Sequence, residues 1–328
     1  MHKKPWLLGA VTLDGKGGAK RLTEFDIEKN GSILKEGTQW INLNLKKYDS
    51  INWLQKKAKL EPWVSEILTD TQESRPRTLF HKNALLLVLR TVPVGSRLDP
   101  DDMIILRLWV TRSRVITVQT TPVVSLQGII SDLERRKGPR NGGELLESIL
   151  DAVLTDISRT VSNLEYEMDD LEEEIIAHME DKQTMPELAE LQRQLVGIRR
   201  YLAPSKEAFD AFSRGRTLWF NEDIIHLAQE SQHRMQRILE DVDLLRERAR
   251  INQEVLQANS AKQNQKNMYM LSVVATLFLP LSFLTGLFGM NVGGIPFATH
   301  GFGLAIVTLF IALIGIVLIF VFKKLRWM

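Results

Sequence analysis

The stretch NMYMLSVVATLFLPLSFLTGLFGMNVGGIPFATHGFGLAIVTLFIALIGIVLIFVF, residues 267–322, decides the fold, because it contains no Asp, Glu, Lys or Arg. A hydrocarbon core about 30 Å thick is crossed by a helix of about 20 apolar residues. The stretch is long enough for two such helices and a short connection. We predict a first membrane span at about 267–288, a loop at 289–300 and a second span at 301–322.

The charges that flank this stretch predict its orientation. Lys262 and Lys266 precede the first span, Lys323 and Lys324 follow the second, and the loop has no Lys or Arg. Because positive charge is retained on the cytoplasmic side, both termini are expected in the cytoplasm and the loop outside. The apolar run at 6–10 is too short for an export signal and is predicted to form a strand and turn.

The charged remainder, residues 1–266, has the pattern of a water-soluble part. Within residues 1–140, β-rich runs alternate with segments of helical spacing, which predicts a cytosolic α/β domain. The β-rich runs are 41–43, 84–89, 103–110 and 115–119, and the helical segments are 51–60 and 63–68. A net charge of +2 gives no reason to expect a nucleic-acid partner. The absence of Cys excludes disulfides and thiolate metal sites.

From residue 141 onward the pattern is helical, so the fold class is α+β. Residues 141–216 are predicted to form two antiparallel helices, from Glu144 to about 181 and from Met185 to about Tyr201, with Pro204 after the second. Residues 217–288 are predicted to form one long helix that begins at Asn221, a suitable N-cap. That helix is roughly 100 Å long and includes a coiled-coil stalk as well as the first span. Residues 323–328 form a basic cytosolic tail.

One face of the first span has the composition of a pore lining. Two helices cannot enclose an aqueous path, so several copies of the chain would have to surround it. The face becomes apolar, with small side chains, where it enters the membrane. Such a face suits a hydrophobic constriction that gates by dewetting, although small residues also allow the packing of a plain two-helix anchor. Its members are Asn264, Met268, Leu271, Ala275, Leu279 and Ser282.

A polar motif, Gly289-Met290-Asn291, follows the first span. A ring of Asn291 side chains would offer neutral amide oxygens to the water shell of a cation. Alternatively, Gly and Asn only cap the helix and turn the chain.

The motif and its surroundings resemble the CorA-type metal ion transporters of divalent cations. The resemblance rests on residues 269–291, with Gly-Met-Asn between two C-terminal spans, and on the basic tail. Four further segments are similar to the zinc-transporting group of that family: 13–18, 74–77, 199–204 and 285–296. The loop has no acidic residue after Asn291, unlike many magnesium channels, which also favours zinc.

The resemblance implies a homopentamer in the bacterial inner membrane, with Gly289, Met290 and Asn291 forming the selective outer mouth. It further implies zinc uptake coupled to protons, with Zn²⁺ as the transported ion and no cofactor. The alternatives are a Mg²⁺/Co²⁺ channel, zinc efflux, or a membrane-anchored coiled-coil scaffold that transports nothing. The sequence has no P-loop, HExxH, GxSxG or dinucleotide motif, so an enzyme is not expected.

Metal ligands are also conceivable outside the pore. His226, Glu230 and His233 lie on one face of the long helix, and their side chains suit zinc, although the face is equally that of a solvated helix. His178 lies beside an acidic run and His300 in the outer loop. Both histidines are candidate zinc ligands, with ordinary surface positions as the alternative.

Overall fold

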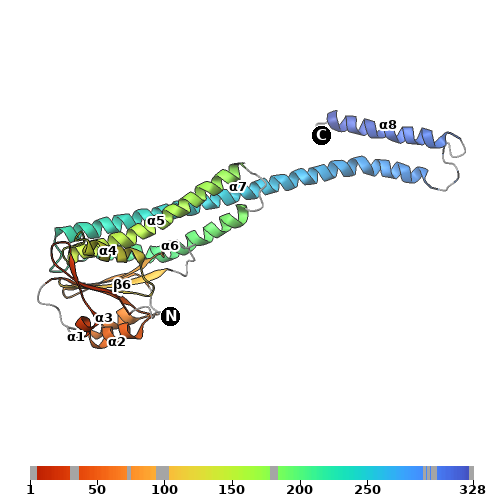
Figure 1. Ribbon diagram of the computed structural model, residues 1–328. Helices are drawn as coiled ribbons and strands as arrows, with labels where there is room; N and C mark the ends of the chain where they lie inside the picture. The colour runs from red at the N-terminus through yellow and green to blue at the C-terminus, as the bar shows by residue number, and fades with distance from the viewer. Residues whose placement is uncertain are drawn as a thin grey trace. The chain divides into compact units, whose positions relative to one another are not determined.

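A computed structural model describes residues 6–29, 37–71, 75–93, 103–177, 184–290, 293, 296 and 301–324. The chain divides into two units, residues 1–253 and 254–328. Helix α7 (Glu222–Phe288) contributes residues to both units (Figure 1). The predicted segments 1–140 and 141–216 therefore belong to a single packed unit.

A mixed sheet forms the centre of the first unit. Within the described residues it has seven strands in the order β2-β1-β3-β7-β6-β5-β4, and only the β3–β7 pair is parallel. The four predicted β-rich runs became β3, β5, β6 and β7. The strands are β1 (Leu7–Leu13), β2 (Ala19–Arg21), β3 (Gln39–Asn44), β4 (Arg77–His81), β5 (Ala84–Thr91), β6 (Ile104–Thr111) and β7 (Arg114–Gln119).

Helices cover both faces of this sheet (Figure 1). Helices α1 (Glu24–Lys29), α2 (Tyr48–Lys56) and α3 (Pro62–Thr69) lie on one face, and α4 (Val124–Glu134), α5 (Gly142–Ala177) and α6 (Thr184–Arg214) lie on the other. Trp53, Val64 and Leu86 belong to the core on the α2–α3 side. Because both faces are covered, β5 is buried along almost its whole length and its sequence is nearly continuously apolar.

Helix α6 corrects one prediction, since it continues through Pro204 to Arg214 instead of ending near Tyr201. Proline removes one helical hydrogen bond. Here, however, the following turns bury Phe209 and Phe212 completely. The hydroxyl of Thr78 on β4 also donates to the Ala208 carbonyl at 2.6 Å. Packing against the sheet therefore compensates for the bond lost at the proline.

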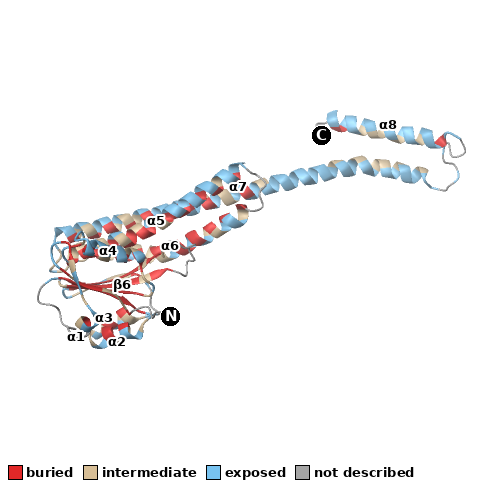
Figure 2. Cartoon of the chain, viewed as in Figure 1, coloured by how far each residue is buried: buried red, intermediate tan, exposed pale blue. Residues whose placement is uncertain are grey.

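The first part of α7 packs against other helices of the same chain. Its buried side chains include Ile238, Val242, Leu245 and Ala249. These positions recur at steps of three and four, the spacing of the predicted coiled-coil stalk. Hydrogen bonds join this part of α7 to both α5 and α6. Figure 2 shows this buried stripe on α7 and its loss in the later part of the helix.

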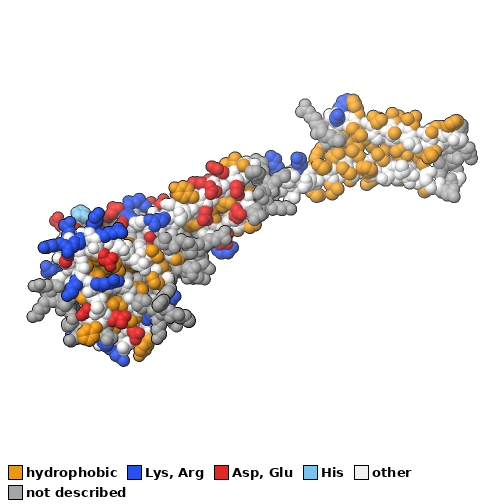
Figure 3. Space-filling model, in the orientation of Figure 1, with side chains coloured by type: hydrophobic (Ala, Val, Ile, Leu, Met, Phe, Trp, Pro, Cys, Tyr) orange, Lys and Arg blue, Asp and Glu red, His pale blue; other side chains and the backbone are white. Residues whose placement is uncertain are grey.

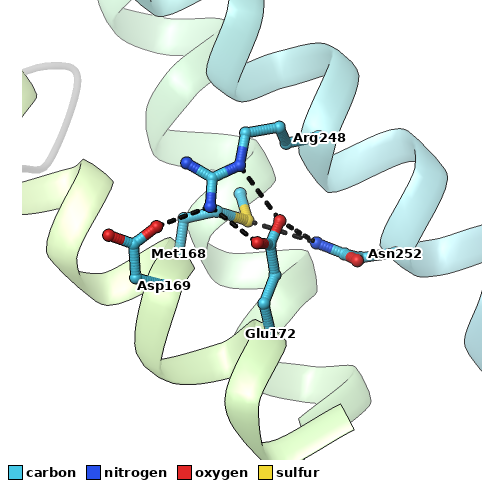
Figure 4. A network of polar contacts seen from close by, with 5 residues as sticks. All are labelled: Met168, Asp169, Glu172, Arg248 and Asn252. Atoms are coloured by element: carbon cyan, nitrogen blue, oxygen red, sulfur yellow. Dashed lines mark hydrogen bonds and ion pairs between the residues drawn. The ribbon is translucent and has the colours of Figure 1, made fainter. Parts of the chain in front are cut away.

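A polar network fixes α7 to α5 (Figure 4). Arg248 Nη2 lies 2.5 Å from Asp169 Oδ1 and 2.7 Å from Glu172 Oε2, and Arg248 Nε donates to Glu172 Oε1 at 3.0 Å. Asn252 donates to the same Glu172 oxygen at 2.8 Å and contacts the sulfur of Met168. Charge-assisted, nearly bidentate bonds of this kind fix the register of two helices.

Candidate functional site

The second unit consists of the end of α7 and of α8 (Gly303–Lys324). Among the described residues, these two helices are long and apolar enough to cross a membrane. Hydrophobic side chains cover their surface in Figure 3, whereas charged side chains cover the first unit. The predicted spans at 267–288 and 301–322 thus coincide with the two apolar helices.

One face of the apolar part of α7 packs against α8. A Cβ placed on Gly315 of α8 would lie 3.8 Å from Leu281 of α7. Leu281 is one of several half-buried side chains that recur at helical spacing on this part of α7: Val273, Leu277, Pro280, Leu281, Leu284 and Phe288. This set therefore marks the side of α7 that α8 covers.

The six residues predicted to line a pore lie on the other side of α7. At about 100° per residue, their mean direction is about 180° from that of the half-buried set. All six are exposed, and the relative exposures of Met268, Leu271 and Leu279 are 63%, 62% and 70%. Helix α8 therefore leaves uncovered the one face on which the sequence predicted the pore. We call this face, Asn264 to Ser282 at helical spacing, the open face.

The end of α7 leads directly into the Gly-Met-Asn motif. Gly289 N donates to the carbonyls of Thr285 and Gly286 at 3.0 and 3.2 Å, which closes the last turn after Phe288. Met290 is half-exposed at 50%. Asn291, His178 and His300 lie outside the described residues, so their predicted roles stay predictions.

The cytosolic candidates His226, Glu230 and His233 are not assembled into a metal site. All three side chains are exposed, and Glu230 Oε1 pairs with Arg237 Nη2 at 3.1 Å. Across the described ranges, no three His, Asp or Glu side chains are close enough to hold one metal ion. The three residues share one helix face, and no further His, Asp or Glu of the described residues completes a ligand set with them.

The sequence reasoning missed the network around Arg248, although it noted the acids of α5. Asp169 and Glu172 are three residues apart, so they lie on one side of α5 and can both reach a single guanidinium. The signal was present in that spacing. The partner could not be identified because it lies more than 70 positions away in the sequence.

Comparisons with known proteins agree over nearly the whole length. The chain is 32% identical over 328 residues to the divalent cation transporter CmaX of Pseudomonas aeruginosa, covering 98% of this chain and 97% of that protein. It is 29% identical to the zinc transport protein ZntB of Yersinia enterocolitica, covering 96% and 94%, and 31% identical to ZntB of Klebsiella pneumoniae, covering 89% and 87%.

Solved structures have the same fold. The full-length CmaX protein superposes with a TM-score of 0.81 at 31% identity, covering all of both chains. The CorA magnesium transporter of Methanocaldococcus jannaschii also gives 0.81 at 20% identity, covering 98% of this chain and 99% of that one, which shows the fold alone. The model of the CorA-like Mg²⁺ transporter proteins matches residues 35–324. The chain therefore belongs to the CorA-like Mg²⁺ transporter family of divalent cation transporters, which are not enzymes.

Proposed function

We propose that five copies of this chain form a pore that carries zinc into the cell across the bacterial inner membrane. The observation that supports this most is the open face of α7. On the side of α7 opposite to α8, this face combines apolar with small side chains. In a ring of copies, that side would face the central axis, and α8 would face lipid.

The proposed ion path carries no fixed charge within the membrane, because residues 267–322 contain no Asp, Glu, Lys or Arg. Selection would then depend on pore width, hydration and the amide oxygens of Asn291. The ZntB relatives named above favour zinc. Since the spans offer no carboxylate to carry a proton, coupling would use groups outside them or a proton that travels with the hydrated ion.

Flux through the purified protein in liposomes tests this function. We expect zinc uptake that exceeds magnesium and cobalt uptake, and that increases when the outside is acidified. Equal magnesium flux would instead indicate a Mg²⁺/Co²⁺ channel. Zinc uptake that ignores an imposed pH gradient would remove the proton coupling, and no flux of any ion would favour the scaffold.

The role of the motif is tested by Asn291→Ala. We expect this variant to assemble normally and to lose most of its zinc flux, because the ring of amide oxygens is gone. Asn267→Ala provides the control, since it removes an amide from the same span at the end away from the motif. Zinc flux that Asn291→Ala leaves at the wild-type level would contradict the selective role of the motif.

A further inference from the structure

The positive charge of the second unit is gathered at one end of its two helices. After Glu254 the chain has no acidic residue, and the basic residues that the structure describes there are Lys262, Lys266, Lys323 and Lys324. All four side chains are exposed. Figure 3 shows basic side chains where the hydrophobic surface of this unit ends.

The two lysines of α7 lie on the face of that helix which α8 covers further along. Val273 is the first half-buried residue of this face. Stepping back from it by four, three and four residues leads to Tyr269, Lys266 and Lys262. At about 100° per residue, the mean direction of the two lysines is about 160° from that of the open face. Lys262 and Lys266 therefore continue the face that α8 covers.

The two lysines of α8 lie in its last turn, beside the uncovered end of this face. Gly315 of α8 lies against Leu281 of α7, and the two helices run in opposite directions (Figure 1). Lys323, eight residues beyond Gly315, is thus level with Val273, eight residues before Leu281. Lys266 lies about 10 Å further along the axis. Since lysine side chains are long and flexible, ammonium groups from both helices can approach one phosphate group.

No carboxylate within the described parts of the chain pairs with these four lysines. Two general effects account for part of their arrangement, because cations in the last turn of a helix favour its dipole and positive residues are retained on the cytoplasmic side of a membrane. Neither effect explains why both lysines of α7 lie on the face that α8 covers, since any face of α7 would serve. A ligand that lies beside α7, at the end of α8, accounts for that direction.

We propose that the four lysines bind the phosphate headgroup of an anionic phospholipid in the cytoplasmic leaflet. This site rests on the proposed membrane crossing, which places the lysines at the level of the headgroups. The uncharged stretch 267–322 begins directly after Lys266 and ends directly before Lys323. Basic pockets between membrane helices on the cytoplasmic side suit such headgroups. In the proposed ring of copies, the lysines of α7 would point toward lipid, away from the open face.

Native mass spectrometry of the purified full-length protein in a neutral detergent tests this site, because it counts the lipids that stay bound. Phosphatidylglycerol, which is anionic, and phosphatidylcholine, which has no net charge, are added separately with the same acyl chains. We expect the wild type to retain several-fold more phosphatidylglycerol. Equal retention of the two lipids would overturn the proposal.

The variant Lys266→Gln/Lys323→Gln removes one charge from each helix, while Lys262 and Lys324 remain to orient the spans. We expect it to lose most of the preference for phosphatidylglycerol. The variant Lys266→Arg/Lys323→Arg keeps both charges and should keep the preference. A glutamine variant that prefers phosphatidylglycerol as strongly as the wild type does would contradict the assignment.

The matched control is Lys46→Gln/Lys56→Gln, which removes two exposed charges from the first unit and should bind lipid as the wild type does. The mass of the assembled protein, recorded in the same spectra, tests a competing explanation. If the glutamine variant released subunits but kept its lipid preference, the lysines would contact another copy of the chain and the proposal would be wrong. The readout is independent of ion flux, so a protein that binds the lipid but carries no zinc would contradict only the proposed transport.

Discussion

Arg248 connects the stalk part of α7 to α5 through hydrogen bonds to two carboxylates. Its side chain is 25% exposed, so solvent screens these bonds only partly. We expect Arg248→Met to keep the aliphatic packing but to cost about 1–2 kcal/mol, because Glu172 loses its main partner. For a chain of this size, that corresponds to a decrease in apparent Tm of a few degrees.

Thermal unfolding in detergent measures this effect, and Arg246→Met serves as the control. Arg246 also pairs with a carboxylate, but with Asp243 on its own helix at 3.1 Å. A pair three residues apart on an exposed helix contributes little. Equal losses in the two variants would contradict the idea that the α5–α7 connection is the stronger one.

The same pair predicts a dependence on pH. The hydrogen bond from Arg248 lowers the pKa of Glu172 below its ordinary value of 4.5. A carboxyl whose pKa is lower in the folded state contributes stability that is present above the unfolded pKa and is lost as the pH falls through the folded pKa. We therefore expect the wild type to lose stability below about pH 4.5 faster than Glu172→Gln.

The apparent Tm of the wild type and of Glu172→Gln, measured between pH 7 and pH 3, tests this prediction. Other carboxyls titrate in both proteins, so their effect cancels when one Tm is subtracted from the other. Glu173→Gln, at the exposed neighbouring position, is the control and should follow the wild type. Parallel curves for the wild type and Glu172→Gln would mean that the pair contributes no pH-dependent stability.

Gly315 of α8 lies against Leu281 of α7. A Cβ on Gly315 would meet the methyl carbons of Leu281 at 3.8 and 4.0 Å, which is ordinary contact, so Gly315→Ala should be tolerated. Gly315→Leu should instead force the helices apart and cost about 1–3 kcal/mol. Ala312→Leu, on the exposed side of α8, is the matched control and should be neutral.

Thermal unfolding, together with the fraction of protein that assembles, measures the difference between these variants. If Gly315→Leu and Ala312→Leu behaved alike, α8 would not cover the Leu281 side of α7. The open face would then lose its main structural support.

Elements with strong apolar periodicity were predictable from the sequence. The long helix was expected from Asn221 to about Phe288, and α7 covers Glu222–Phe288. The edge strands β2 and β4 were missed, because a strand at the edge of a sheet buries little and shows weak alternation. The course of α6 through Pro204 was also missed, since it depends on a sheet surface that local sequence does not reveal.

For the candidate site too, features set by residues close in the sequence were predictable, and features set by residues far apart in the sequence were not. Helical spacing alone placed Met268, Leu271 and Leu279 on one face, and the structure leaves that face exposed. The sequence did not predict whether a second helix would cover this face. The answer depends on which side of α7 packs against Gly315 of α8. For His226, Glu230 and His233 the spacing likewise predicted a shared helix face, but not whether a second element would supply further ligands.

The proposed assembly can be tested by disulfide cross-linking, because the chain has no native cysteine. A single introduced cysteine can form a disulfide only with another copy of the chain. If the open face surrounds a central axis, Leu279→Cys brings equivalent sulfurs together and should form dimers readily under a membrane-permeable oxidant. The control Leu309→Cys lies on the exposed side of α8, which would face lipid, and should stay monomeric.

Denaturing electrophoresis without reductant separates these outcomes, and the yield also reports on subunit number. A ring with an odd number of subunits always leaves one chain unpaired, so a pentamer limits the dimer to about four fifths of the chains. A tetramer or hexamer would allow complete conversion. Efficient cross-linking at Leu309 and none at Leu279 would place α8 at the axis instead. In that case the open face of α7 would face lipid, and its composition would reflect membrane insertion and not an ion path.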